Sequence, residues 1–122
     1  MKAFAAELDP QPFHLEKTAA AASLFHGVAA SGWLTAAATT CLLVTGGLPF
    51  ANGIIGLGGE IAWPKPVRPG DTIYPVAEVT EMRVSASKPD RGLVTVAYRV
   101  QNQRGETVLT MRSIQLVKRR PA

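Results

Sequence analysis

The stretch that decides the fold spans residues 31–45 and reads SGWLTAAATTCLLVT. Ser31 is a favourable N-cap, and the glycine pair at 46–47 followed by Pro49 is a favourable stop signal. The segment is therefore predicted to be one helix of about 15 residues, roughly 22 Å long. Small or apolar side chains lie on nearly every face, which is typical of a buried helix. A single helix can be surrounded only by a sheet that curls around it, and Cys41 within it is expected to be a buried, inert thiol.

The rest of the chain after this helix has the pattern of strands. Alternation is clearest over residues 94–100, where the even-numbered valines and Tyr98 share one face. We predict four strands with short connections, over residues 54–62, 72–84, 93–101 and 107–117. The apolar phase of the last strand shifts between Met111 and Ile114, which predicts a bulge or a face open to a partner. No crossover helix separates the strands, so an antiparallel sheet and an α+β fold are predicted, in one domain over residues 1–122.

The chain before the helix carries a carboxylate and an imidazole on a proline-rich segment, DPQPFH at residues 9–14. Prolines fix their own φ and bias the preceding residues toward extended backbone. The segment is therefore predicted to be a rigid loop rather than a helix, between short helices at 3–8 and 18–25. Asp9 and His14, held around one point, can share a water and exchange protons near neutral pH. The alternative is that Asp9 caps the helix that follows and His14 is a surface residue.

Composition limits the classes of function. Hydrophobic residues make up 47% and charged residues 18%, as in a globular protein. The 13 Lys and Arg against 9 Asp and Glu give a net charge of +4, which suits a phosphate-bearing ligand. One cysteine permits no disulfide within the chain, no targeting segment is evident, and the longest apolar stretch, 32–44, is shorter than the about 20 residues that span a bilayer. We expect a cytoplasmic protein without membrane, nucleic-acid or metal partners.

The sequence resembles the MaoC-like branch of the hotdog-fold acyl-CoA hydratases and dehydratases. Four segments carry the resemblance, in order along nearly the whole chain: FA at 4–5 leading into D-x-x-P-x-H at 9–14, ASGW at 30–33, Trp63 with PVRPGD at 66–71, and S-x-SKPDRG at 85–92 followed by NQ-x-G at 102–105. The resemblance implies a hotdog fold, in which an antiparallel sheet wraps one long central helix. It also implies two subunits joined edge to edge, with the site at their interface. Relatives usually carry a first strand well upstream of the matching Asp, so that strand is expected to be missing here unless the chain starts further upstream.

The same resemblance implies the central site residues. Asp9 and His14 match the pair that holds a catalytic water, with their separate proton roles left open. Gly32 would offer its backbone N–H to the thioester carbonyl, which agrees with the free N–H groups and partial positive charge of a helix N-terminus. Ser31 and Thr40 lie where some relatives carry His and Ser, respectively, and both are candidate substrate contacts, Thr40 through its hydroxyl.

Five further residues are candidate substrate contacts. Trp63 is expected to form a core contact or a pocket wall, and Gly58 to admit the pantetheine arm close to a strand backbone. The cations Arg83, Lys88 and Arg91 either belong to a solvated loop or anchor the phosphates of coenzyme A. No cofactor is expected apart from the coenzyme A of the substrate.

The predicted function is reversible hydration or dehydration of an enoyl-CoA or 3-hydroxyacyl-CoA thioester in fatty-acid metabolism. The enzyme would be a hydro-lyase that forms a homodimer or an oligomer of dimers. Two alternatives stay open. One is a non-catalytic acyl-CoA-binding module or subunit, which Leu34 favours because many relatives carry His there. The other is a hotdog thioesterase, in which a carboxylate activates water toward the carbonyl carbon and His14 is not needed.

Overall fold

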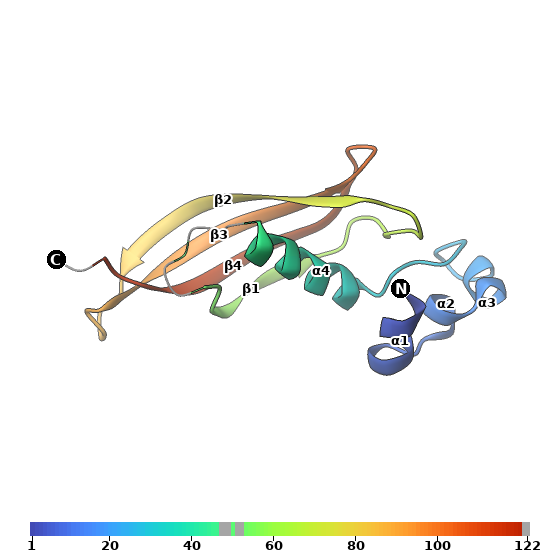
Figure 1. Cartoon of the computed structure of the whole chain (residues 1–122), viewed down its shortest axis with the longest axis horizontal. Coiled ribbons are helices and arrows are strands. Elements are labelled where there is room, and N and C mark those ends of the chain that lie inside the picture. Colours follow the sequence, from blue (N-terminus) through green and yellow to red (C-terminus); the bar gives the residue numbers. More distant parts are fainter. Residues whose placement is uncertain (47–49, 51–52, 121–122) are drawn as a thin grey trace.

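The computed structural model describes residues 1–46, 50 and 53–120. The elements are α1 (Lys2–Leu8), α2 (Pro12–Leu15), α3 (Lys17–Ala21), α4 (Gly32–Thr45), β1 (Gly56–Ala62), β2 (Ile73–Val84), β3 (Arg91–Asn102) and β4 (Thr107–Lys118). The strands form one antiparallel sheet in the order β1-β4-β3-β2, and no strand precedes α4 in the described part of the chain. Figure 1 shows a curved sheet with α4 across one face and α1–α3 grouped beyond the N-terminal end of α4.

A turn built on Asn102 joins β3 to β4. Its side-chain Oδ1 accepts the backbone N–H groups of Arg104 at 3.0 Å and Glu106 at 3.1 Å. Gly105 adopts φ of +77°, a left-handed conformation that glycine reaches without steric cost. The short, well-bonded turn makes the two strands neighbours in the sheet and therefore antiparallel.

The core lies between the sheet and α4. Val94, Val96 and Tyr98 of β3 form one buried cluster with Leu43 of α4. A second cluster, against which Ala36 of α4 packs, consists of Val100, Val108 and Leu109. The predicted alternation over residues 94–100 is thus confirmed, because its apolar members all point into this core.

Helix α4 begins where the sequence predicts. The N-cap Ser31 accepts the N–H of Trp33 through its hydroxyl oxygen at 3.3 Å. Gly46 is the C-cap. The other predicted stop signals, Gly47 and Pro49, lie outside the described residues.

Helix α4 is buried on one side only, so the prediction of a helix buried all round is wrong for the single chain. Thr35, Thr39 and Leu43 follow each other at four-residue spacing and are buried. Trp33, by contrast, is 59% exposed, and Cys41, predicted to be buried, is exposed. The physical reason is that a four-stranded sheet covers only one side of a helix. Apolar periodicity alone cannot tell whether the other side of the helix is covered.

The prediction that residues 9–14 form a loop is wrong in its second half. Helix α2 begins at Pro12 and carries His14. A proline at the first helical position loses no hydrogen bond, and its fixed φ suits a helix. Asp9 is the C-cap of α1, whereas Gln11 is the N-cap of α2, so the alternative in which Asp9 caps the following helix is also wrong.

The predicted bulge in β4 lies elsewhere. From Met111 to Ile114 the strand pairs continuously with both neighbours. The extra residue of β4 is Val108, which has no partner in β3. Val108 and Leu109 are adjacent and both fully buried, which a regular strand does not allow and a bulge does.

Candidate active site

Three segments meet at the N-terminal end of α4 and bring the candidate catalytic residues together. Asp9 ends α1, His14 lies on α2 and Ser31 caps α4. In Figure 1 the short helices stand beside the start of α4, away from the bulk of the sheet. The pair predicted from the proline-rich segment is therefore joined by a hydroxyl from the central helix.

Both oxygens of the Asp9 carboxylate accept hydrogen bonds. Oδ2 accepts from Ser31 Oγ at 2.7 Å, and Oδ1 accepts from Gln11 Nε2 at 2.6 Å. His14 Nε2 lies 3.3 Å from Oδ2. The Ser31 hydrogen bond, then the Gln11 hydrogen bond, lower the pKa of Asp9; burial opposes them, and the charge interaction with His14 adds to them. Asp9 is therefore an ionised carboxylate held in one orientation.

His14 is buried, and each of its ring nitrogens lies close to an oxygen atom of the chain. Nδ1 lies 2.7 Å from the carbonyl oxygen of Ala29, and because a carbonyl only accepts, Nδ1 carries a hydrogen. Nε2 consequently presents a lone pair toward Asp9 when the ring is neutral and an N–H when it is charged. Phe13 and Phe25 pack against the ring, with centroids 4.5 and 6.0 Å away. The alternative of a surface histidine is wrong.

A cavity of about 420 Å³ opens beside this pair. Asp9 and His14 form part of its polar lining, and Trp33 and Trp63 stand in its wall edge to face, with centroids 5.2 Å apart. Gly32, the first residue of α4, also lines it. Within the described residues no acceptor bonds to the Gly32 N–H, as expected of a first-turn amide, so this group is available to a ligand.

The arrangement can hold one water and stabilise one developing negative charge. A carboxylate and an imidazole nitrogen 3.3 Å apart can both accept hydrogens from the same water. The free N–H at the start of α4, with the partial positive charge of the helix, can receive an oxygen that becomes an oxyanion. No set of three His, Cys, Asp or Glu side chains gathers as a metal site in the described part of the chain.

The other candidate substrate contacts divide between the cavity and more distant places. Trp63 forms a cavity wall, as expected. Thr40 is exposed two turns along α4 and donates its hydroxyl to the Ala36 carbonyl at 3.1 Å. Gly58 is exposed in β1. Neither Thr40 nor Gly58 lines the cavity within the single chain.

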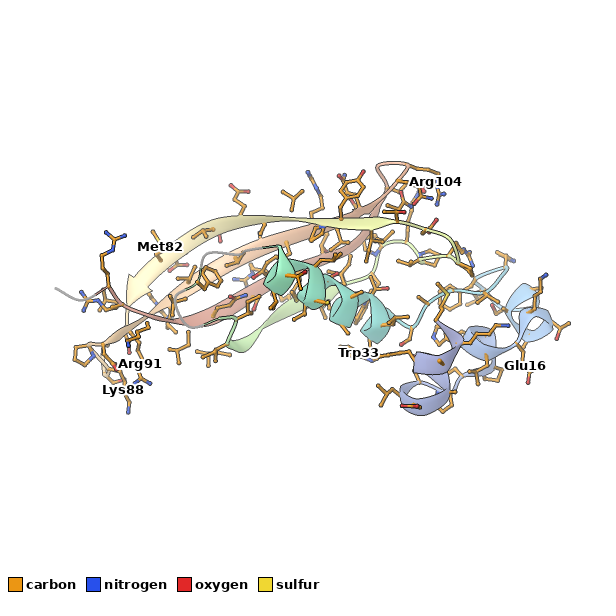
Figure 2. All side chains as sticks on the ribbon, viewed as in Figure 1. Glu16, Trp33, Met82, Lys88, Arg91 and Arg104 are labelled. Atoms are coloured by element: carbon orange, nitrogen blue, oxygen red, sulfur yellow. The ribbon has the colours of Figure 1, made fainter. Side chains whose placement is uncertain are left out.

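The three candidate phosphate anchors lie at the opposite end of the sheet. Figure 2 shows Lys88 and Arg91 at one end of the molecule and Trp33 toward the other. Arg83 is near the end of β2, beside these two. Arg91 is bound at two points by Asp90, at 2.9 and 3.2 Å. The fold of one chain therefore does not bring these cations to the cavity.

Two residues that position the site were not singled out from the sequence. Gln11 donates a hydrogen bond to Oδ1 of Asp9. The sequence feature that could have pointed to it is its side-chain amide, two positions after Asp9 on the same proline-rich segment. Arg68 donates to the carbonyls of Gly27 at 2.9 Å and Val28 at 3.2 Å, and also to that of Phe25. It fixes the segment that leads into α4. No local pattern could have revealed this, because its partners are 40 to 43 residues away in sequence.

Comparison with known proteins places the chain in a family. The model of the MaoC like domain matches residues 1–103. The chain belongs to the MaoC-like dehydratase family. A MaoC-like dehydratase from Rhodospirillum rubrum is 55% identical, with a TM-score of 0.94 over 99% of this chain and 83% of that one. The resemblance stated from the four sequence segments is thus confirmed, and the α+β architecture of this MaoC-like chain is the hotdog fold.

Two further relatives extend the comparison. The (R)-hydratase from A. caviae involved in PHA biosynthesis is 30% identical, with a TM-score of 0.72 over 96% of the MaoC-like chain and 83% of the hydratase. Protein YdeM of Bacillus subtilis (strain 168), itself uncharacterized, is 30% identical over 117 residues, which is 95% of this chain and 82% of YdeM. Among the described residues, no helix is both long and apolar enough to cross a membrane. Family membership makes hydro-lyase chemistry the activity to consider first.

Proposed function

We propose that this MaoC-like protein is a hydro-lyase that reversibly hydrates an enoyl-CoA thioester to a 3-hydroxyacyl-CoA thioester in fatty-acid metabolism. The observation that carries the proposal is the placement of Asp9 and His14, 3.3 Å apart, on a cavity that is also lined by Gly32, whose N–H has no acceptor within the described residues. The (R)-hydratase among the relatives supports the reaction class. The net charge of +4 suits a substrate that carries phosphates.

The geometry supports a specific order of events. The thioester carbonyl accepts the Gly32 N–H, and the water lies on the cavity side of the pair, within hydrogen-bond distance of both Asp9 and Nε2 of His14. Its oxygen bonds to C3 while the C2=C3 π electrons move toward the thioester oxygen, which becomes an enolate. The water proton passes to Nε2, whose lone pair is free because Nδ1 holds the other hydrogen. C2 then takes that proton from the same side, the carbonyl re-forms, and His14 returns to its neutral state.

Asp9 acts as a fixed carboxylate in this sequence. Its lowered pKa disfavours protonation, so it orients the water and stabilises the imidazolium that His14 becomes. One well-placed oxyanion donor such as Gly32 N–H contributes about 3 kcal/mol to such a reaction. A hotdog thioesterase would need the carboxylate alone. The buried, hydrogen-bonded His14 therefore favours hydration over thioester hydrolysis.

We also propose that the protein acts in the cytoplasm as a homodimer or an oligomer of dimers. Apolar side chains remain uncovered on α4 and on the edge strand β2, where Met82 is 74% exposed and Val84 57%. Arg83, Lys88 and Arg91 would then contact the substrate bound at another subunit's cavity. Sedimentation that shows only monomer at micromolar concentration would contradict this part of the proposal.

The test is turnover of short and medium enoyl-CoA thioesters, followed as loss of the conjugated absorbance. Asp9→Asn and His14→Ala should each lower kcat by about a hundredfold to ten-thousandfold. Glu78→Gln and His26→Asn are the matched controls, because both residues are exposed and neither lines the cavity. Release of free coenzyme A thiol would indicate a thioesterase. Binding of acyl-CoA by folded protein without turnover would indicate a non-catalytic module.

A further inference from the structure

A continuous chain of hydrogen bonds runs from Trp63 to the Asp9 carboxylate. The indole Nε1–H of Trp63 donates to the Gly32 carbonyl at 2.9 Å. The same peptide unit carries the N–H of Trp33, which donates to Ser31 Oγ at 3.3 Å. The Ser31 hydroxyl donates to Oδ2 of Asp9 at 2.7 Å. Every donor points in the same direction along the chain, so each bond polarises the next.

The Trp63 ring lies against α4 only because residue 32 is a glycine. A Cβ built on Gly32 would lie 2.7 Å from Cε2 and 2.8 Å from Nε1 of Trp63, closer than real Cβ atoms approach. Trp63 follows directly after β1 and is 31 positions from Gly32 in sequence. A cavity wall alone would need neither the close approach nor the hydrogen bond. The indole is therefore fitted to the first turn of α4.

We propose that Trp63 is a positioning residue, whose indole N–H orients the Gly32–Trp33 peptide and, through Ser31, holds the Asp9 carboxylate in its working position. The kinetic consequence rests on the proposed hydratase function, whereas the structural consequence does not. By fixing the first turn of α4, the same contact also fixes the direction of the Gly32 N–H. Trp63 touches none of the reacting atoms in the proposed reaction.

The electrostatic consequence falls on Asp9. The hydrogen bond from Ser31 is the largest influence that lowers the pKa of this carboxyl. A hydroxyl that accepts a well-aligned hydrogen bond donates a stronger one, so loss of the Trp63 N–H weakens the bond to Asp9. The other titratable groups on the cavity are His14 and Lys65, and Lys65 is paired with Glu106 at 2.6 Å. Removal of the Trp63 N–H should therefore raise the pKa of Asp9.

The test variant is Trp63→Phe, which keeps an aromatic ring at this position and removes the N–H together with part of the indole; the control below loses the same ring atoms. We expect kcat to fall about threefold to tenfold with KM changed less than about twofold, as loss of one positioning hydrogen bond implies. The acid limb of the kcat profile should move to higher pH. In parallel, the Asp9 carboxyl carbon, followed by NMR, should titrate at a higher midpoint than in the wild type.

The matched control is Trp33→Phe. Trp33 stands in the same cavity wall, and within the described residues its indole donates no hydrogen bond to the α4 backbone. The Asp9 titration in this variant should match that of the wild type. An unchanged Asp9 midpoint in Trp63→Phe, or equal shifts in both variants, would overturn the proposal.

A second measurement uses the wild-type protein, so that a folding defect in the variant cannot hide the answer. The indole N–H of Trp63 should exchange with solvent more slowly than that of Trp33, and equally fast exchange would contradict the hydrogen bond to Gly32. Neither NMR readout needs turnover. If the wild-type protein shows no turnover but the Asp9 midpoint shifts in Trp63→Phe, only the hydratase proposal is contradicted. If the wild type turns over but the Asp9 midpoint does not shift in Trp63→Phe, only the role of Trp63 is contradicted.

Discussion

The two ends of the sheet differ in how complete they are within one chain. At the N-terminal end of α4, Asp9 and His14 are held by partners from the same chain. Each of their side-chain polar atoms lies close to a polar atom of that chain. At the other end, Arg83 and Lys88 are exposed, and Met82 stands uncovered on the edge strand. The geometry of the candidate site is thus built by one chain, whereas the far end presents exposed apolar and cationic groups to a second molecule.

This difference follows from the chemistry of the two regions. A buried histidine and a carboxylate need fixed hydrogen-bond partners, because unsatisfied polar groups are costly away from water. Long cationic side chains keep their charges solvated without partners, so a chain can carry them to an interface at little cost. The comparison predicts that changes at the catalytic end act on kcat, and that changes at the far end act on substrate affinity or assembly.

Of the remaining predictions, Ser31→Ala, at the N-terminal end of α4, should have the largest effect on turnover. Loss of the hydroxyl frees Oδ2 of Asp9 and removes the largest influence that lowers its pKa. We expect kcat to fall about tenfold to a hundredfold, and the acid limb of the rate profile to move to higher pH because Asp9 is needed in its ionised form. Loss of the N-cap should also cost about 1 kcal/mol of stability.

Thr45→Ala is the control for this change. Its hydroxyl lies on the same helix but donates to the Cys41 carbonyl at 2.8 Å, far from the cavity. Turnover and pH profile should stay at wild-type values in this variant. An unshifted acid limb in Ser31→Ala would show that the Ser31–Asp9 bond does not tune the carboxylate.

The second expected effect is at the far end, in Arg83→Gln combined with Lys88→Gln. If these cations contact the phosphates of the substrate, KM for a coenzyme A thioester should rise about threefold to tenfold. KM for the matching pantetheine thioester, which lacks the nucleotide phosphates, should not change. Arg99→Gln removes an exposed charge from the middle of β3 and serves as the control. Equal effects on both thioesters would show that the far-end cations do not bind phosphate.

The smallest expected effect concerns stability in acid. Lys65, then Arg104 and Asn102, hydrogen-bond to Glu106 and lower its pKa from an ordinary 4.5 to about 2. Because the folded-state pKa is depressed, this contribution is complete above pH 4.5 and is lost as the pH falls from 4.5 toward 2. Urea unfolding of Glu106→Gln should show a shallower loss of stability over this window than the wild type. Parallel curves would contradict the depressed pKa.

Sequence patterns predicted the parts of the molecule that depend on local periodicity. The alternation over residues 94–100 placed Tyr98 in the core, and Ser31 was recognised as the start of α4. Asp9 and His14 could be paired because five positions on a proline-stiffened segment keep them close. These features are encoded by residues near one another in sequence, so reading the sequence was sufficient.

Features that depend on contacts between distant segments could not be predicted. The exposure of Cys41 depends on whether anything covers the outer side of α4, and the apolar periodicity of the helix carries no information about that. The hydrogen bond from Trp63 to Gly32 joins a connector to a helix across 31 positions. The error at Pro12 was of another kind, since proline both ends helices and begins them, and only the following residues decide which.

The most direct test of the proposed chemistry is the mass of the product that purified wild-type protein forms from a short enoyl-CoA thioester. We expect a 3-hydroxyacyl-CoA, heavier than the substrate by one water, with one deuterium bound at C2 when the reaction is run in D₂O. Free coenzyme A thiol, or unchanged enoyl-CoA recovered from folded protein that binds it, would contradict the proposal that Asp9 and His14 add water across the double bond.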